Sequence, residues 1–212
     1  MSYITVKAKA EAEFIEKRSR FIASCAPVKS SKEALEFIES LRKKHWDAAH
    51  NVYAYVIKEE GVQRFSDDGE PQGTAGMPVL DVLLKNGVTD CVIVVTRYFG
   101  GILLGAGGLV RAYSKSAKLG LDAAGLIEMR DCTSFSVVCD YSFYGNVEAF
   151  IRDSGSIIED TRFTDNVEID FVIENTKKYK FLKDFPDVTL GRFTPIEKGS
   201  VYKAFDLNLN ES

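Results

Sequence analysis

The sequence predicts an α+β protein of two domains, and two observations carry that prediction. Segments with the period-two alternation of strands are interspersed with segments whose apolar residues recur at helical spacing. The charge also divides along the chain: residues 1–130 contain 18 Lys and Arg against 16 Asp and Glu, whereas residues 131–212 contain 9 against 15. With 212 residues, the chain can bury a sizeable core. We therefore expect domains over residues 1–130 and 131–212.

The first domain is expected to alternate strands and helices. Its first helix has a serine cap and apolar residues at Ala34, Leu35, Ile38 and Leu41, and Trp46 is expected in the core. Pro78 lies near the start of the second helix, where proline is tolerated. In chain order the predicted elements are two or three strands within residues 3–28, a helix over 30–46, a strand over 51–57, a short strand within 59–71, a helix over 74–87, a strand over 90–99 and a helix over 105–125.

The second domain shows a simpler order of elements. The predicted elements are a strand over 133–141, a helix over 143–155, a hairpin over 156–164 and 166–174, a helix over 175–187 and strand material over 188–207. The order βαββαβ is that of the ferredoxin-like unit. Because this part is acidic, we expect it to repel nucleic acid and to meet protein instead.

The composition contains no sign of a membrane-spanning or exported protein. No apolar run approaches the length of about 20 residues that crosses a membrane, and the first 20 residues lack the apolar core of an export signal. The four cysteines, Cys25, Cys91, Cys132 and Cys139, form no C-x-x-C pair and lie in apolar surroundings. We expect reduced, mostly buried thiols in a cytoplasmic protein with no metal and no cofactor.

Five glycines lie within nine positions: Gly100, Gly101, Gly105, Gly107 and Gly108. A glycine-rich turn between a strand and a helix can present backbone N–H groups and a positive helix end to an anion. The spacing matches neither the Walker pattern nor G-x-G-x-x-G. The glycines alone are therefore equally compatible with anion binding and with close packing of backbone.

The helix that follows these glycines favours a partner that carries phosphate. Arg111, Lys115 and Lys118 share one face of it, Arg97 arrives from the preceding strand, and residues 91–121 contain no acid. Leu109, Tyr113, Ala117 and Leu121 recur every four residues and are expected in the core. Tyr98 and Phe99 are adjacent in a strand, so one is expected to stack on a partner and the other to be buried.

Acidic residues just before the second helix are expected to shape the rim of this surface. A metal site is one interpretation, but Asp-Gly is also common in turns, and no calcium-loop spacing is present, so we favour a turn with a functional surface. Asp68 or Glu70 could pair with Arg97 or Arg111. Two histidines that share no helix face, with no nucleophile beside them, identify no catalytic group. The expected rim comprises His50, Asp67, Asp68, Glu70 and Thr74.

Three segments together closely resemble the IMPACT/YigZ family: "AAHNVYAYV", "FSDDGEPQGTAGMPVL" and "VIVVTRYFGGILLGAGGLVRAYSKSA". The family signature corresponds here to Arg97, Tyr98, Phe99, Gly100, Gly101, Leu104 and Gly105. The resemblance spans about residues 15–125, and the C-terminal part is similar to the second domain of bacterial members.

The resemblance implies a fold and a function. The first domain would have the left-handed βαβ fold of a small-subunit ribosomal protein and of elongation factor G domain IV, and the second would be similar to domains III and V of that factor. Eukaryotic members regulate translation during stress. We therefore expect a non-catalytic, cytoplasmic regulator of translation that binds RNA or the ribosome through the basic glycine-rich loop and helix.

Two alternatives remain open at this point. The fold also occurs in small-molecule kinases whose glycine-rich loop binds ATP, so a nucleotide- and Mg²⁺-dependent phosphotransferase or hydrolase is possible. The other alternative is a protein–protein adaptor, in which the glycine loop packs tightly.

Overall fold

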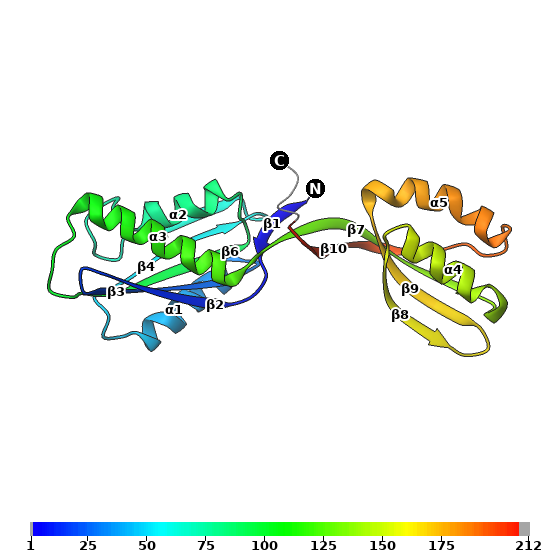
Figure 1. The fold of residues 1–212 in the computed structure, drawn as a ribbon, viewed down its shortest axis with the longest axis horizontal. Coiled ribbons are helices and arrows are strands. Elements are labelled where there is room, and N and C mark those ends of the chain that lie inside the picture. The colour runs from blue at the N-terminus through cyan, green and yellow to red at the C-terminus, as the bar shows by residue number, and fades with distance from the viewer. Residues whose placement is uncertain (1, 208–212) are drawn as a thin grey trace. The chain divides into compact units, whose positions relative to one another are not determined.

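The structure, a computed structural model, describes residues 2–207 and divides them into two compact units (Figure 1). Tyr3–Glu128 form the first unit, and Met129–Phe205 form the second. Within the described residues there are five α-helices and two five-stranded sheets, so the protein is of the mixed α+β class.

The first unit contains nine elements. In chain order they are β1 (Tyr3–Val6), β2 (Ala10–Glu16), β3 (Ser19–Pro27), α1 (Ser31–Lys44), β4 (His50–Ile57), β5 (Val62–Ser66), α2 (Gly76–Lys85), β6 (Cys91–Tyr98) and α3 (Ala106–Ala124). The main sheet has the strand order β2-β3-β6-β4-β5, and every neighbouring pair is antiparallel. Strand β6, whose seven residues from Cys91 to Arg97 are all buried, therefore lies at its centre.

Helices cover both faces of this sheet. One core cluster packs α2 and α3 on one face, and a second cluster packs α1 on the other (Figure 1). The four apolar residues predicted to face the core from α3 are all buried, which confirms that prediction: Leu109, Tyr113, Ala117 and Leu121.

Helix α1 shows where the predicted core was wrong. Ser30 caps it, because its hydroxyl accepts the N–H of Glu33 at 3.2 Å, and Ala34, Ile38 and Leu41 are buried as predicted. Leu35 is instead 48% exposed and Trp46 is 83% exposed. The narrow apolar stripe of this helix is filled by residues at i, i+4 and i+7, which leaves Leu35 beside it.

The second unit begins within β7 (Leu126–Cys139) and continues through α4 (Tyr141–Asp153), β8 (Ile157–Phe163), β9 (Val167–Glu174), α5 (Asn175–Thr189) and β10 (Ile196–Asp206). In the sheet, β9 lies between β7 and β8, both antiparallel to it, and β10 pairs with β7. Helices α4 and α5 pack on a separate core that contains Phe135, Phe171 and Phe181.

The four cysteines are free and buried, as predicted. Although Cys25 and Cys91 are distant in sequence, adjacent strands bring their Sγ atoms to 3.4 Å. Among residues 2–207, no helix combines the length and the apolar character needed to cross a bilayer.

Candidate functional site

The glycine loop between β6 and α3 packs against the turn between β2 and β3. A Cβ atom on Gly100 would lie 2.1 Å from the carbonyl carbon of Arg18, and the Gly100 N–H donates to the Ser19 hydroxyl at 3.2 Å. Gly101 and Gly105 have φ angles of +81° and +72°, which favour glycine. Close backbone approach thus explains Gly100, and chain conformation explains Gly101 and Gly105.

Arg97 is buried rather than presented to solvent. Its guanidinium donates to Glu70 Oε1 at 2.6 Å and to the Ser19 hydroxyl at 3.4 Å, and only 5% of the residue is exposed. The ring of Phe21 lies 5.4 Å from its central carbon. The predicted pairing of Glu70 with Arg97 is confirmed, but the expectation that Arg97 offers its charge on the surface is wrong, because Glu70 already neutralises it.

Glu70 connects three elements at this point. Its Oε1 atom also accepts the Tyr113 hydroxyl at 2.7 Å, so α3 and β6 are tied to the segment before α2. Burial and the Glu70 charge raise the pKa of Tyr113 well above its usual range, which keeps its hydroxyl a donor. His50 Nε2 lies 3.7 Å from the same oxygen, and His50 Nδ1 contacts the Asp68 carbonyl at 2.8 Å.

The other predicted rim residues stabilise the loop before α2. The Asp67 carboxylate accepts backbone N–H groups of Gly73, Ala75 and Gly76 at 2.8–3.1 Å, and so provides an acceptor for the first N–H group of α2. The Thr74 hydroxyl donates to the Pro71 carbonyl at 2.6 Å.

Asp68 points to a different partner. It accepts from Arg42 at 3.1 Å and from the Asn51 N–H at 2.6 Å. Asp67, Asp68 and Glu70 therefore diverge, and within residues 2–207 no group of three or more His, Cys, Asp and Glu side chains is placed to hold a metal ion.

Tyr98 and Phe99 contact different surroundings. The Tyr98 hydroxyl contacts His45 Nδ1 at 3.0 Å and Asp47 at 3.2 Å. Phe99 is 51% exposed, with one ring face near the Arg97 guanidinium at 5.5 Å. Phe99 is thus the residue of the two that can stack on a ligand.

The cations of α3 divide into two kinds. Arg111 and Lys115 are exposed, and neither forms an ion pair with any described residue; Lys115 lies 4.8 Å from the centre of the Phe14 ring. Lys118 forms an ion pair with Asp122 one turn further on. Residues 91–121 contain no acid, but Asp122 is the next residue, and its pairing with Lys118 offsets the charge of that lysine.

Two further cations were missed by the sequence analysis. Lys17 and Arg18 form the turn between β2 and β3, both exposed and both with positive φ, and Gly100 packs against this turn. Their signal was the basic run "EKRSR" between two alternating segments. It could not have been assigned to this site without the pairing of β3 with β6.

Two hollows adjoin the start of α3. The first, which we call the apolar hollow, has a volume of about 380 Å³ and is lined by His50, Glu70, Pro71, Arg97, Phe99, Leu103, Leu104, Gly105, Ala106 and Leu109. The second, the cationic hollow, has a volume of about 230 Å³ and is lined by Phe14, Glu16, Lys17, Leu104, Gly108, Arg111, Ala112 and Lys115. Arg97 and Arg111 thus belong to different hollows.

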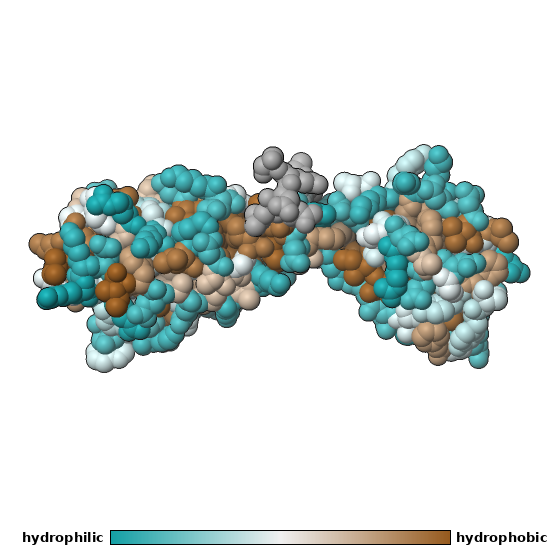
Figure 2. Space-filling model, in the orientation of Figure 1, coloured by the Kyte–Doolittle hydropathy of each residue, from teal (hydrophilic) through white to brown (hydrophobic). Residues whose placement is uncertain are grey.

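The glycine loop between β6 and α3 carries exposed apolar side chains. Phe99, Ile102 and Leu103 are 51%, 39% and 81% exposed. Figure 2 shows hydrophobic residues gathered at the end of the first unit where this loop lies. The loop therefore offers apolar contact beside the cations.

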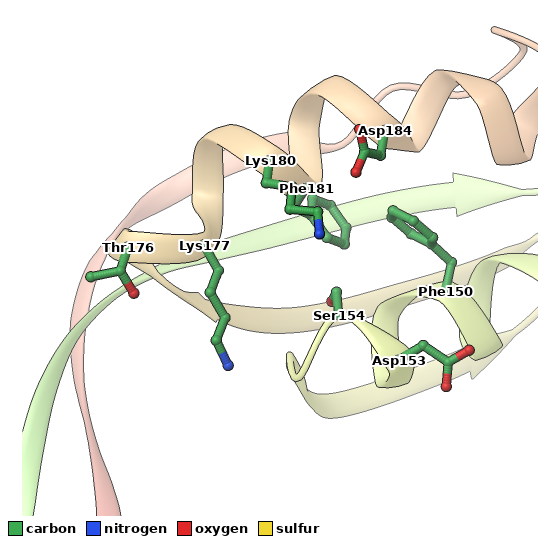
Figure 3. A pocket seen from close by; sticks show the side chains of 8 residues that line it. All are labelled: Phe150, Asp153, Ser154, Thr176, Lys177, Lys180, Phe181 and Asp184. Atoms are coloured by element: carbon green, nitrogen blue, oxygen red, sulfur yellow. The ribbon is translucent and has the colours of Figure 1, made fainter.

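A third hollow, of about 430 Å³, lies between α4 and α5 in the second unit (Figure 3). Phe150 and Phe181 face each other there with ring centres 5.2 Å apart. Two lysines and two aspartates occupy its rim: Asp153, Lys177, Lys180 and Asp184. The acidity of the second unit is therefore not uniform.

Comparison with known proteins places these features in a family. The family model "Impact N-terminal domain" matches residues 17–121, and "Domain of unknown function (DUF1949)" matches residues 137–192. The chain is 41% identical over 201 residues to "IMPACT family member YvyE" of Bacillus subtilis, which covers 94% of this chain and 92% of that protein. It is 40% identical over 146 residues to "IMPACT family member YigZ" of Escherichia coli, covering 67% and 72%.

More distant and structural similarities agree with this. "Protein IMPACT" of Homo sapiens is 39% identical over 94 residues, which is 42% of this chain and 29% of that protein. A solved structure described as "Crystal structure of an hypothetical protein" aligns with a TM-score of 0.59 at 30% identity, covering 99% of this chain and 98% of that chain.

Proposed function

Since the chain belongs to the IMPACT family, we propose that it is a non-catalytic, cytoplasmic regulator of translation that binds RNA or the ribosome through the first unit. The observation that carries this proposal is the set of exposed cations around the cationic hollow. Arg111 and Lys115 of α3 and Lys17 of the β2–β3 turn line it, and Glu16 is the one acid in its wall. These side chains can meet successive phosphates of a strand.

The rest of the site supplies support for this binding surface. The Arg97–Glu70 pair holds β6 and the segment before α2 together, and Gly100 brings the β2–β3 turn against the glycine loop. In this proposal Arg111, Lys115 and the β2–β3 turn make the phosphate contacts that the sequence predicts for Arg97. Lys118 contributes less, because Asp122 offsets its charge.

We also infer more specific folds for the two units. The first would have the left-handed βαβ fold of a small-subunit ribosomal protein and of elongation factor G domain IV; β3 and β4, joined by α1, flank β6 in its sheet. The second would have the ferredoxin-like fold of elongation factor G domains III and V, which the strand order β10-β7-β9-β8 supports.

The second unit is the better candidate for a protein partner. Tyr141 and Phe163 are 55% and 56% exposed and stack with ring centres 6.3 Å apart. Exposed aromatic residues are enriched in protein interfaces. This surface, rather than its net negative charge alone, supports a protein contact.

The RNA-binding proposal is tested by the salt dependence of affinity. Single-stranded RNA would be titrated by fluorescence anisotropy with the wild-type protein and with Arg111→Ala/Lys115→Ala. We expect weaker binding and a slope of log K against log salt that is shallower by about 1.4, because two phosphate contacts are lost. Lys32→Ala/Lys43→Ala, which removes the same charge from exposed positions on α1, is the control and should change neither quantity. Equal effects of the two pairs would overturn the proposal.

A further inference from the structure

Three features of the apolar hollow indicate what kind of ligand it could bind. The first is the start of α3. Helix α3 has 19 residues, its N-cap is Gly105, and no side chain caps it. The N–H groups of Ala106, Gly107 and Gly108 have no acceptor among the described residues, and the first turn contains no acid. The end of such a helix carries a positive partial charge and favours an anion.

The second feature is the buried pair in the wall. Arg97 and Glu70 are 95% and 92% buried, since 5% and 8% of each is exposed. Arg97 Nε donates to no described residue. Both hydrogen bonds to Glu70 fall on Oε1, at 2.6 Å and 2.7 Å, so Oε2 accepts none within the described part of the chain. A carboxylate oxygen in that position can accept a hydroxyl from a ligand.

The third feature is an apolar wall with an exposed aromatic ring. Pro71, Leu103 and Leu109 line the hollow together with Phe99. A flat ring can stack on Phe99, as bases stack on aromatic side chains of proteins that bind single strands.

We propose that the apolar hollow binds one ribonucleotide unit. Its phosphate lies at the N-terminus of α3, a ribose hydroxyl donates to Glu70 Oε2, and the base lies against Phe99. The chemistry requires an anion, a hydroxyl donor and an apolar ring in one ligand, and a volume of about 380 Å³ accommodates such a unit. The inference rests on the proposed function, because the strand bound along Arg111 and Lys115 supplies this nucleotide.

The test uses a pair of variants at the exposed residue Ala106. Ala106→Asp places a carboxylate at the start of α3, where it competes with a bound phosphate. Ala106→Asn has nearly the same shape without the charge. Neither threatens the fold, and the aspartate is expected to stabilise the helix slightly. Circular dichroism and the unfolding midpoint check that both variants fold.

Adenosine 5′-monophosphate and a single-stranded RNA of about ten nucleotides are the two probes. Affinity for the mononucleotide is measured by calorimetry, with adenosine as the ligand that lacks the phosphate. We expect adenosine to bind more weakly than the monophosphate. Ala106→Asp should reduce affinity for the monophosphate by about tenfold relative to Ala106→Asn.

The two probes separate the sources of the nucleotide. Loss of both RNA and monophosphate binding in Ala106→Asp supports a nucleotide delivered by a strand; loss of monophosphate binding alone supports a free nucleotide. Equal binding of both probes by Ala106→Asp and Ala106→Asn overturns the inference. If the wild-type protein then still binds RNA in a manner that depends on Arg111 and Lys115, the proposed function survives that failure.

Discussion

At the scale of single residues, the buried pair of Glu70 and Arg97 organises the site. Arg97 comes from the centre of the sheet, and Glu70 from a segment 27 residues earlier, held in place through Asp67. Tyr113 adds a third partner from α3. Because the charges neutralise each other and both side chains are buried, this cluster holds the surrounding segments together and presents little charge to solvent.

Removal of one partner of this pair should be strongly destabilising. Glu70→Ala leaves the buried Arg97 guanidinium without its charged partner and the Tyr113 hydroxyl without an acceptor, and we expect a loss of about 3–5 kcal/mol in the free energy of unfolding. Urea denaturation measures this. Glu70→Ala/Arg97→Ala should lose less than the sum of the two single variants.

The exposed pair of Glu13 and Arg20, whose atoms lie 2.8 Å apart against 2.6 Å in the buried pair, provides the control for this cycle. Glu13→Ala should leave the unfolding midpoint nearly unchanged, because exposed ion pairs contribute little. A small effect of Glu70→Ala, similar to that of Glu13→Ala, would show that the buried pair does not hold the site together.

His45 should make stability depend on pH. Burial lowers its pKa, and the nearby Lys44 charge lowers it further; Nε2 has no partner among the described residues. The unfolded chain, with a histidine pKa near 6.5, therefore binds the proton more tightly. The free energy of unfolding should fall as the pH falls from about 7 to 5. In His45→Gln this slope should flatten; an identical slope in the variant would assign the effect elsewhere.

At the scale of elements, the continuous segment formed by β6, the glycine loop and α3 contributes most of the candidate site. The loop must approach the β2–β3 turn closely at Gly100, whereas Gly107 lies in the first turn of α3 with space around it. The two glycines therefore have different structural roles although both belong to the same glycine-rich segment.

Substitution of these two glycines should have opposite effects. Gly100→Ala would force the Cβ to within 2.1 Å of the Arg18 carbonyl carbon, so we expect a destabilisation of about 1–3 kcal/mol. Gly107→Ala meets only Arg111 Nη1 at 3.7 Å and should stabilise α3 by about 0.5–1 kcal/mol. Thermal unfolding compares the two. Equal shifts would mean that the loop does not pack on the turn.

Periodicity predicted the elements well and the site only in part. The repeat through Leu109 and Tyr113 identifies a buried face because helix geometry determines which residues share it. The Arg97–Glu70 contact was anticipated as a pair, but its burial depends on the whole sheet. The i, i+4 spacing of Lys118 and Asp122 predicts their pairing, although residues 91–121 alone contain no acid.

At the scale of the whole molecule, the net charge does not describe the local charge of either unit. The chain carries a net charge of −4, yet Arg111 and Lys115 lie exposed and without ion pairs to described residues. In the second unit, Arg162 contacts three acids, Asp160, Glu168 and Asp170, so part of its negative charge is neutralised internally. The net charge of the chain therefore predicts neither the exposed cations of α3 nor the ion pairs around Arg162.

The most direct test of the central claim is co-sedimentation of the full chain with ribosomes and separated subunits at low and moderate salt. We expect association that weakens with salt, is lost in Arg111→Ala/Lys115→Ala and is retained in Lys32→Ala/Lys43→Ala. Association that is equal in both pairs of variants, or absent from the wild-type protein at low salt, would contradict the claim that this cationic surface binds the translation apparatus.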